Sequence, residues 1–175
     1  MTNQHCYQKC SQTSAAFFYE NEDGEFGEKM KCVKSYQPFE GYDYWFFEVE
    51  SVPAGVKELQ LVNANVSSGQ SLWLIGHPRG APKEIDASKE CRVYQVSVGT
   101  LHNRLENFTH QCDTEGGSSG SPVIDGVNHL IVGLHWGAGA STTDPESGNL
   151  AIPIYKVLEH LYANQPDLYN KINKY

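Results

Sequence analysis

The stretch that decides the fold of this chain is GGSSGSPV, residues 116–123. It sets Ser119 among glycines, directly before an apolar segment. Glycine adopts backbone dihedrals that strain other residues, so such a turn can expose a serine hydroxyl beside several backbone N–H groups. Successive N–H groups that converge on one point stabilise an oxyanion. The stretch by itself favours a nucleophilic serine over a plain Gly/Ser turn between strands, and the rest of the chain decides between the two.

A nucleophilic serine needs a base, and the base needs a group that orients it. The chain offers His5 near its start and Asp43 ahead of an aromatic run. The order His5, Asp43, Ser119 is the order found in chymotrypsin-like double β-barrels. An α/β-hydrolase needs Gly-x-Ser-x-Gly with its histidine last, whereas here the second residue after Ser119 is Ser121. We therefore expect an all-β double barrel in which His5 is the general base, Asp43 fixes its tautomer and Ser119 attacks the substrate.

Five segments resemble one known family. They read TNQHC (2–6), DYWFFEV (43–49), CDTEGGSSGSP (112–122), LIVGLHWG (130–137) and NLAIPI (149–154). In these segments the chain resembles trypsin-like serine proteases of the branch that contains bacterial glutamyl and lysyl endopeptidases. The resemblance implies a serine endopeptidase that hydrolyses peptide bonds of a polypeptide through a Ser/His/Asp triad and an acyl-enzyme, with no cofactor and no metal.

The resemblance also implies how a substrate would be held. The backbone N–H groups of Gly117 and Ser119 would form the oxyanion hole. The residues implied in substrate binding are Thr114, Leu134, His135, Trp136 and Gly137. In glutamyl endopeptidases, a threonine and a histidine at the places of Thr114 and His135 bind the carboxylate of a glutamate. Lysyl enzymes also carry a histidine near this strand, and His135 could instead only pack on Trp136, so both alternatives stay open.

The domain organisation follows from the same comparison. We expect a partial N-terminal barrel in residues 1–58, carrying His5 and Asp43. Residues 59–175 would hold the second barrel, with Ser119, the specificity pocket and a terminal helix. In the family about three strands precede the histidine, whereas four residues do so here. The first barrel is thus expected to be incomplete. Two alternatives follow: a catalytically inactive, protease-like binding module, or a fragment that is active only with a missing N-terminal segment or a partner chain.

Composition excludes some functions. The chain has 175 residues, and 13 basic against 21 acidic side chains give a net charge of −8. No basic cluster supports nucleic-acid binding, and no apolar stretch approaches the roughly 18 residues of a membrane span. The chain carries no secretory signal, although the family resemblance favours a secreted or periplasmic location.

The chain has five cysteines, an odd number: Cys6, Cys10, Cys32, Cys91 and Cys112. Cys91 and Cys112 flank one expected hairpin, and Cys10 and Cys32 bracket another, so each pair could form a disulfide. Cys6 would then be left over, and in relatives a cysteine at this place commonly pairs with one upstream. The alternative is five free thiols in a reducing compartment.

Short apolar runs alternate with turn residues along the chain, which is typical of an all-β protein. The expected strands are residues 15–19, 29–35, 44–49, 72–76, 92–99, 102–111, 123–124, 130–134 and 151–153. Turns are expected at 21–27 and 77–80, and a connection between the barrels at 52–58. The apolar spacing of residues 154–162 predicts a helix that caps the second barrel, and residues 165–175 could form a second short helix.

Overall fold

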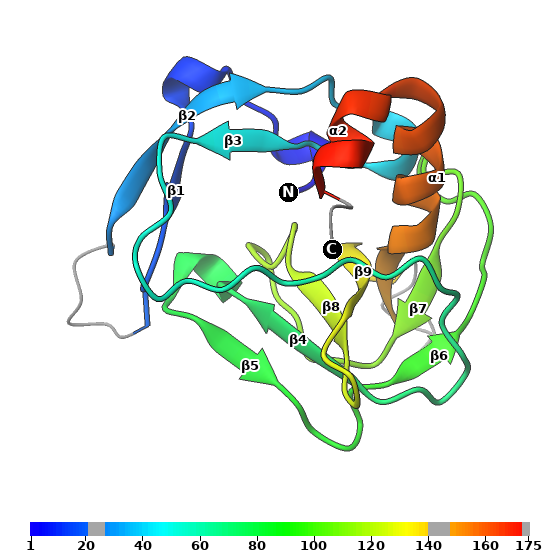
Figure 1. The fold of residues 1–175 in the computed structure, drawn as a ribbon. Coiled ribbons are helices and arrows are strands. Elements are labelled where there is room, and N and C mark those ends of the chain that lie inside the picture. The colour runs from blue at the N-terminus through cyan, green and yellow to red at the C-terminus, as the bar shows by residue number, and fades with distance from the viewer. Residues whose placement is uncertain (21–26, 140–147, 173–175) are drawn as a thin grey trace.

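The computed structural model of the chain describes residues 1–20, 27–139 and 148–172. Most of the turn predicted at 21–27 lies outside the described residues. Two antiparallel sheets and two C-terminal helices make up the described fold (Figure 1). Four single-turn 3-10 helices connect them: η1 (Gln4–Cys6), η2 (Cys10–Gln12), η3 (Glu40–Tyr42) and η4 (Pro78–Gly80). None of the helices in these ranges has the length and apolarity required to cross a membrane.

The larger sheet has seven strands and closes on itself. Its order is β5 (Glu84–Asp86), β4 (Leu72–Gly76), β8 (Pro122–Asp125), β9 (Ile131–Gly137), β10 (Asn149–Pro153), β7 (Phe108–His110) and β6 (Val93–Gln95). Residues just before β4 meet residues just before β6, where Ser71 bridges Arg92. Two hydrogen bonds flank this bridge, from Leu72 N to the Cys91 carbonyl and from Val93 N to the Gln70 carbonyl, both 2.9 Å. Closure removes the free edges that an open sheet would leave.

The smaller sheet belongs to the N-terminal half and has the order β1 (Ser14–Ala16), β2 (Lys29–Ser35) and β3 (Phe47–Val49). The start of the chain runs beside the residues that precede β3. Thr2 and Trp45 exchange two backbone hydrogen bonds of 2.9 and 2.8 Å. In the described ranges this half is a three-stranded sheet with added bridges, in agreement with the predicted all-β, chymotrypsin-like fold with an incomplete first barrel.

The two helices join the halves. Helix α1 (Ile154–Asn164) packs on β9 and β10, and α2 (Pro166–Ile172) lies near β3 (Figure 1). One core cluster combines residues of both halves with the helices, because Tyr44 and Leu134 pack with Val157 of α1. The Tyr44 hydroxyl also lies 2.8 Å from Nδ1 of His160. Helix α1 packs on the second barrel as predicted, and it also contacts the first half, because its polar side meets Tyr44.

Several strands are shorter than predicted. The strand predicted at 15–19 ends at Ala16, because Phe18 adopts a left-handed backbone conformation with φ of 62°. The strand predicted at 44–49 begins only at Phe47. Tyr44 and Trp45 bridge separate partners instead, Phe39 and Thr2 respectively.

The hairpin predicted from residues 92–99 and 102–111 keeps regular pairing only in β6 and β7. The register of the pairing shifts after Val93, and a tight turn bridged by Leu101 and Arg104 forms the tip of the hairpin. Strand β5 was not predicted, because Ile85 stands between two acidic residues and is itself exposed, so no apolar alternation marks it.

Two valines test the core between the halves. Val157 is 0% exposed on α1, whereas Val127 is 84% exposed in a turn. We expect Val157→Ala to lower the free energy of unfolding by about 2 kcal/mol, because the lost methyl groups leave a cavity. Val127→Ala should change it by less than about 0.5 kcal/mol. Urea unfolding of both variants measures the difference, and equal effects would contradict this account of the core.

Candidate active site

Asp43 is held at the end of a tight turn. The 3-10 helix η3 ends at Tyr42 and is capped by Asp43, whose backbone N–H donates to the Glu40 carbonyl at 3.0 Å. Asp43 adopts a left-handed conformation with φ of 42°, which aspartate tolerates better than most residues. Its side chain is 0% exposed. A carboxylate removed from water in this way depends entirely on protein partners.

The first segment of the chain wraps around Asp43. The Asp43 carbonyl accepts hydrogen bonds from Gln4 N at 3.0 Å and from Asn3 Nδ2 at 3.1 Å. The His5 backbone N–H donates to Oδ1 of Asp43 at 3.0 Å, and His5 Nδ1 lies 2.8 Å from Oδ2. A carboxylate at Nδ1 keeps the proton on that nitrogen and leaves the lone pair of Nε2 free to accept another. The imidazole is 35% exposed, so Nε2 can reach a substrate.

Ser119 lies in the glycine-rich turn before β8. Gly117 and Gly120 adopt φ values of 100° and 87°, which favour glycine at both positions. Gly120 packs against Thr2, and a Cβ there would collide with the Thr2 side chain. The serine-bearing turn therefore lies directly against the segment that carries His5.

Ser119 Oγ donates to the Trp136 carbonyl at 3.4 Å. Within the described residues, no hydrogen bond joins Ser119 to His5. Catalytic hydrogen bonds are often long in an enzyme without substrate and tighten when substrate binds. The geometry thus brings His5 and Asp43 into direct contact and Ser119 onto the adjoining turn.

The turn around Gly117 is braced from behind. Arg79 N donates to the Gly116 carbonyl at 2.7 Å. A Cβ at Gly117 would lie 2.8 Å from Arg79 N and 3.0 Å from the His77 carbonyl. A side chain at Gly117 would push this turn away, so glycine is required beside Ser119 if the N–H groups here are to meet an oxyanion.

Strand β9 borders the site, but its predicted residues face different surroundings. Trp136 is half-buried beside Ser119, whereas His135 is only 3% exposed. Thr114 lines a different space, a cavity of about 660 Å³ that Arg79 and Asp86 also line. In the part of the chain that the structure describes, no hydrogen bond joins Thr114 to His135.

His135 belongs to a buried histidine pair that sequence reasoning missed. Its Nδ1 lies 3.2 Å from Nε2 of His110. Burial, reinforced by the nearby His5, lowers the pKa of His135 to about 4. A hydrogen bond to the Leu150 backbone raises this pKa, but by less than burial lowers it. Burial and the neighbouring His135 lower the pKa of His110 to about 3. Both rings are neutral at pH 7, and no periodicity or motif in the sequence predicted that they would meet.

A second residue that sequence reasoning missed is Arg104. Its Nη2 and Nε lie 3.0 and 3.3 Å from Oδ2 of Asp43, the same oxygen that faces His5. The partner lies 61 residues away in the chain, in a loop with no recognisable signal.

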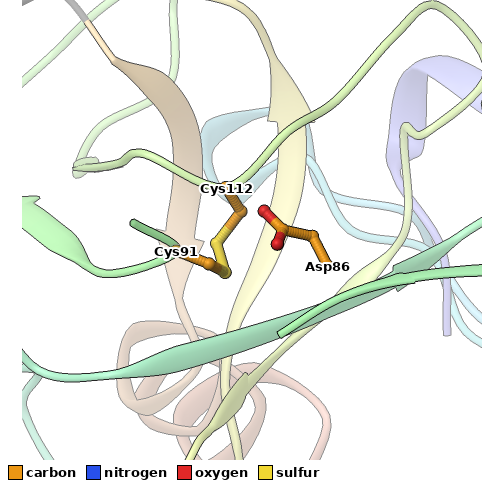
Figure 2. Close-up of side chains that lie close together, drawn as sticks. All are labelled: Asp86, Cys91 and Cys112. Carbon is orange, nitrogen blue, oxygen red and sulfur yellow. A yellow bond between two sulfur atoms is a disulfide. The ribbon is translucent and has the colours of Figure 1, made fainter. Parts of the chain in front are cut away.

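The structure forms two disulfides, Cys10–Cys32 and Cys91–Cys112, and leaves Cys6 as an exposed thiol. Asp86 lies beside the second disulfide (Figure 2). These three side chains come close enough for a metal, but the bonded sulfurs are not thiolates, which are the form that binds metals. The Asp86 carboxylate instead accepts hydrogen bonds from the backbone N–H groups of Asp113 and Ser88, at 2.8 and 2.9 Å.

Comparison with known proteins identifies the class. The family model of the trypsin-like peptidase domain matches residues 1–134. This match covers most of the chain, so the protein belongs to the trypsin-like peptidase domain family, whose substrates are polypeptides. A search of curated proteins found no match.

Solved structures agree with the fold. The inactive form of the Rv3671c protease, an M. tuberculosis protein, has a TM-score of 0.72 and 16% identity, over 94% of this chain and 77% of that chain. An inactivated protease paralogue from the scabies mite has a TM-score of 0.69 and 16% identity, over 93% and 82%. The HtrA-type protease AlgW, solved with a decapeptide, has a TM-score of 0.66 and 14% identity, over 93% of this chain and 48% of that chain. At these identities the likeness shows the fold alone.

The buried histidine pair predicts acid sensitivity. The unfolded chain protonates both histidines below their ordinary pKa of 6.5, whereas the folded protein keeps them neutral down to about pH 4. The unfolded state therefore binds more protons in this window, and stability falls as the pH drops from 6.5 to 4. Each histidine contributes at most about 1.4 kcal/mol per pH unit.

We expect His110→Gln to flatten this acid slope, measured by urea unfolding between about pH 6.5 and pH 4.5. The same exchange at the exposed His77 is the matched control. A slope unchanged in His110→Gln would contradict the assignment of neutral buried rings.

Proposed function

We propose that the protein is a serine endopeptidase whose triad is Ser119, His5 and Asp43. One observation carries the proposal: the fully buried Asp43 carboxylate holds Nδ1 of His5 at 2.8 Å beside the glycine-rich turn that bears Ser119. A buried carboxylate that fixes an imidazole next to a serine is the arrangement that acyl transfer by serine requires. Membership of the trypsin-like peptidase family supports the same reaction.

The reaction proceeds in two halves. Nε2 of His5 takes the proton of Ser119 Oγ as that oxygen attacks the carbonyl carbon of the scissile bond. The N–H groups of Gly117 and Ser119 stabilise the oxyanion, and Asp43 stabilises the imidazolium. His5 then gives the proton to the leaving amine, which departs and leaves an acyl-enzyme on Ser119. Water attacks this ester with His5 again as base, and the acid product and free Ser119 result.

The end of β9 supplies a wall for the substrate. Strand β8 begins at Pro122, which pairs with Leu134. The serine turn extends this pairing by one residue, because Gly120 N donates to the His135 carbonyl at 2.9 Å and His135 N donates to the Ser121 carbonyl at 3.0 Å. Beyond His135, within the described residues, no main-chain to main-chain hydrogen bond joins Trp136 or Gly137 to the Ser119 turn, and only Ser119 Oγ reaches the Trp136 carbonyl. This edge is open at Trp136 and Gly137, where a peptide can pair with β9 as an added strand and present its carbonyl to Ser119.

A fluorophosphonate probe tests the triad, because it labels only an activated serine. We expect the purified chain to be labelled once, at Ser119, as measured by intact mass and peptide mapping. Ser119→Ala should abolish labelling, and His5→Ala should slow it by about 10²-fold or more, since the base is lost. Ser121→Ala, an exchange in the same turn, is the matched control.

The main alternative is a non-catalytic binding module of protease fold. The long Ser119–Trp136 contact and the missing Ser119–His5 hydrogen bond within the described ranges favour it. Folded protein that resists the probe would decide for the module. Labelling that appears only after an upstream segment or a partner chain is added would decide for a fragment.

We also propose glutamate as the residue before the scissile bond, with lysine as the alternative. A threonine hydroxyl and an imidazole N–H can both donate to a carboxylate. In its present state the His135 ring is engaged with His110 and the Leu150 backbone. Binding of glutamate therefore requires the ring to turn toward the substrate, and otherwise His135 only shapes the pocket.

Matched peptides that differ only in Glu, Gln or Lys at this position measure the preference. We expect kcat/KM for Glu to exceed that for Gln by about 10-fold or more, because the site donates to the carboxylate. Thr114→Val and His135→Phe should each bring the Glu to Gln ratio toward one. A preference for Lys would support lysine as the residue before the scissile bond. Equal hydrolysis of all three peptides would mean that His135 only shapes the pocket.

A further inference from the structure

The carboxylate of Asp43 has a partner from the other half of the molecule. Arg104 is 16% exposed, Asp43 is 0% exposed, and the guanidinium holds Oδ2 with two nitrogens. Most ion pairs of the described residues lie at the surface, where solvent weakens them. This one is buried, and breaking it would leave the carboxylate with fewer of its hydrogen bonds.

A tight hairpin tip presents Arg104. Leu101 and Arg104 exchange backbone hydrogen bonds of 3.0 and 2.8 Å. The two residues between them, His102 and Asn103, have φ values of 46° and 66°. Positive φ at both central positions is the type I′ turn, a conformation that histidine and asparagine adopt more readily than most other non-glycine residues. The His102 carbonyl in turn accepts from Nη1 of Arg104 at 2.8 Å, so the turn itself directs the guanidinium.

The hairpin tip docks on the turn that carries Asp43. Leu105 N donates to the Gly41 carbonyl at 2.7 Å. A Cβ at Gly41 would lie 3.0 Å from Leu105 Cδ1 and nearer still to the Phe39 ring, so the contact depends on glycine. Backbone pairing and the Arg104 side chain therefore hold the same turn from the same side.

Arg104 also contacts the strand beside Ser119. Its Cζ lies 4.5 Å from the centroid of the Trp136 ring, in the range of a cation–π contact. Asn107 locks both partners, because its Oδ1 accepts from Trp136 Nε1 at 2.9 Å and its Nδ2 donates to the Arg104 carbonyl at 3.1 Å. The guanidinium is thus fixed between Asp43 of the N-terminal half and Trp136 of β9.

We propose that Arg104 is a positioning residue that holds the Asp43 carboxylate against His5 and ties it to the strand beside Ser119. The proposal rests on the proposed protease function. Arg104 opposes, by its charge, the positive charge that develops on His5 during the reaction. Orientation outweighs this effect, because without Arg104 the buried Asp43 carboxylate keeps, among the described residues, hydrogen bonds to His5 alone.

Steady-state hydrolysis of one peptide substrate tests the role, with kcat counted per titrated Ser119. Arg104→Ala should lower kcat by about 10- to 100-fold, the range for losing a group that orients a reacting side chain. KM should stay within about two-fold, because Arg104 acts through Asp43 and not on the substrate. Arg104→Lys should fall between, since an ammonium cannot form the two-nitrogen contact. The exposed Arg92, exchanged for Gln, is the matched control and should match the wild type.

Chemical rescue separates positioning from stability. Millimolar methylguanidinium should restore part of the kcat of Arg104→Ala and leave Arg92→Gln unchanged, whereas a protein that had only lost stability would not respond. If Arg104→Ala does not fold, the Lys variant decides: kcat lowered at unchanged KM supports the proposal, and kcat equal to or above that of the wild type overturns it.

The two proposals fail in different ways. Wild-type protein that is folded but neither labels nor hydrolyses contradicts the protease function. Active wild type with equally active Arg104 variants contradicts only the positioning role. A readout without activity also exists: the His5 Nδ1 proton bound to Asp43 gives a downfield NMR resonance. We expect this resonance to broaden or disappear in Arg104→Ala, and an unchanged resonance would overturn the proposal whether or not the protein hydrolyses peptides.

Discussion

The burial of one carboxylate organises this molecule. Asp43 has no solvent contact, so every oxygen of the residue needs a protein donor. Its backbone carbonyl accepts hydrogen bonds from Asn3 and Gln4, and Oδ1 accepts one from the backbone N–H of His5. Oδ2 contacts the ring Nδ1 of His5 and the guanidinium of Arg104. The start of the chain and a hairpin of the second half therefore converge on a single turn. Removing any one donor to the carboxylate leaves its buried charge with fewer hydrogen bonds, so the contacts of the site depend on one another.

Contacts between the halves support this arrangement from two sides. On one side, the hairpin tip at residues 101–105 docks on the Asp43 turn through Arg104 and Leu105. On the other, helices α1 and α2 bury apolar residues against Tyr44, which follows Asp43 directly in the chain. Lys171 of α2 pairs with Glu48 of β3 at 2.6 Å. The closed seven-stranded sheet is the frame that carries Ser119 and β9. The hairpin tip and the two helices of the second half then position the N-terminal sheet against this frame.

Much of the fold followed from local pattern. Strands 29–35 and 72–76 were predicted with their observed bounds. The first alternates polar and apolar side chains, and the second is a short apolar run that ends at a turn. The prediction failed where backbone conformation depends on distant partners. Phe18 turns out of its strand, Tyr44 and Trp45 bridge different segments, and β5 has an exposed centre that no alternation marks. In the site, His5 and Asp43 were predicted as partners and lie in contact, whereas Thr114 and His135 face different surroundings, and their roles stay predictions together with that of Ser119.

The sequence by itself determined the fold class and the candidate chemistry. The candidate site is marked by a serine among glycines and by a histidine and an aspartate in a particular order. Residue type, order and spacing can all be read directly from the sequence. Only the tertiary structure decided what surrounds them. Arg104 meets Asp43 across 61 residues, and His110 meets His135 across 25, both at interior positions where closely packed strands and turns set the distance. Such pairings depend on how two distant segments pack in space, and this packing produces no periodic pattern in the amino-acid sequence.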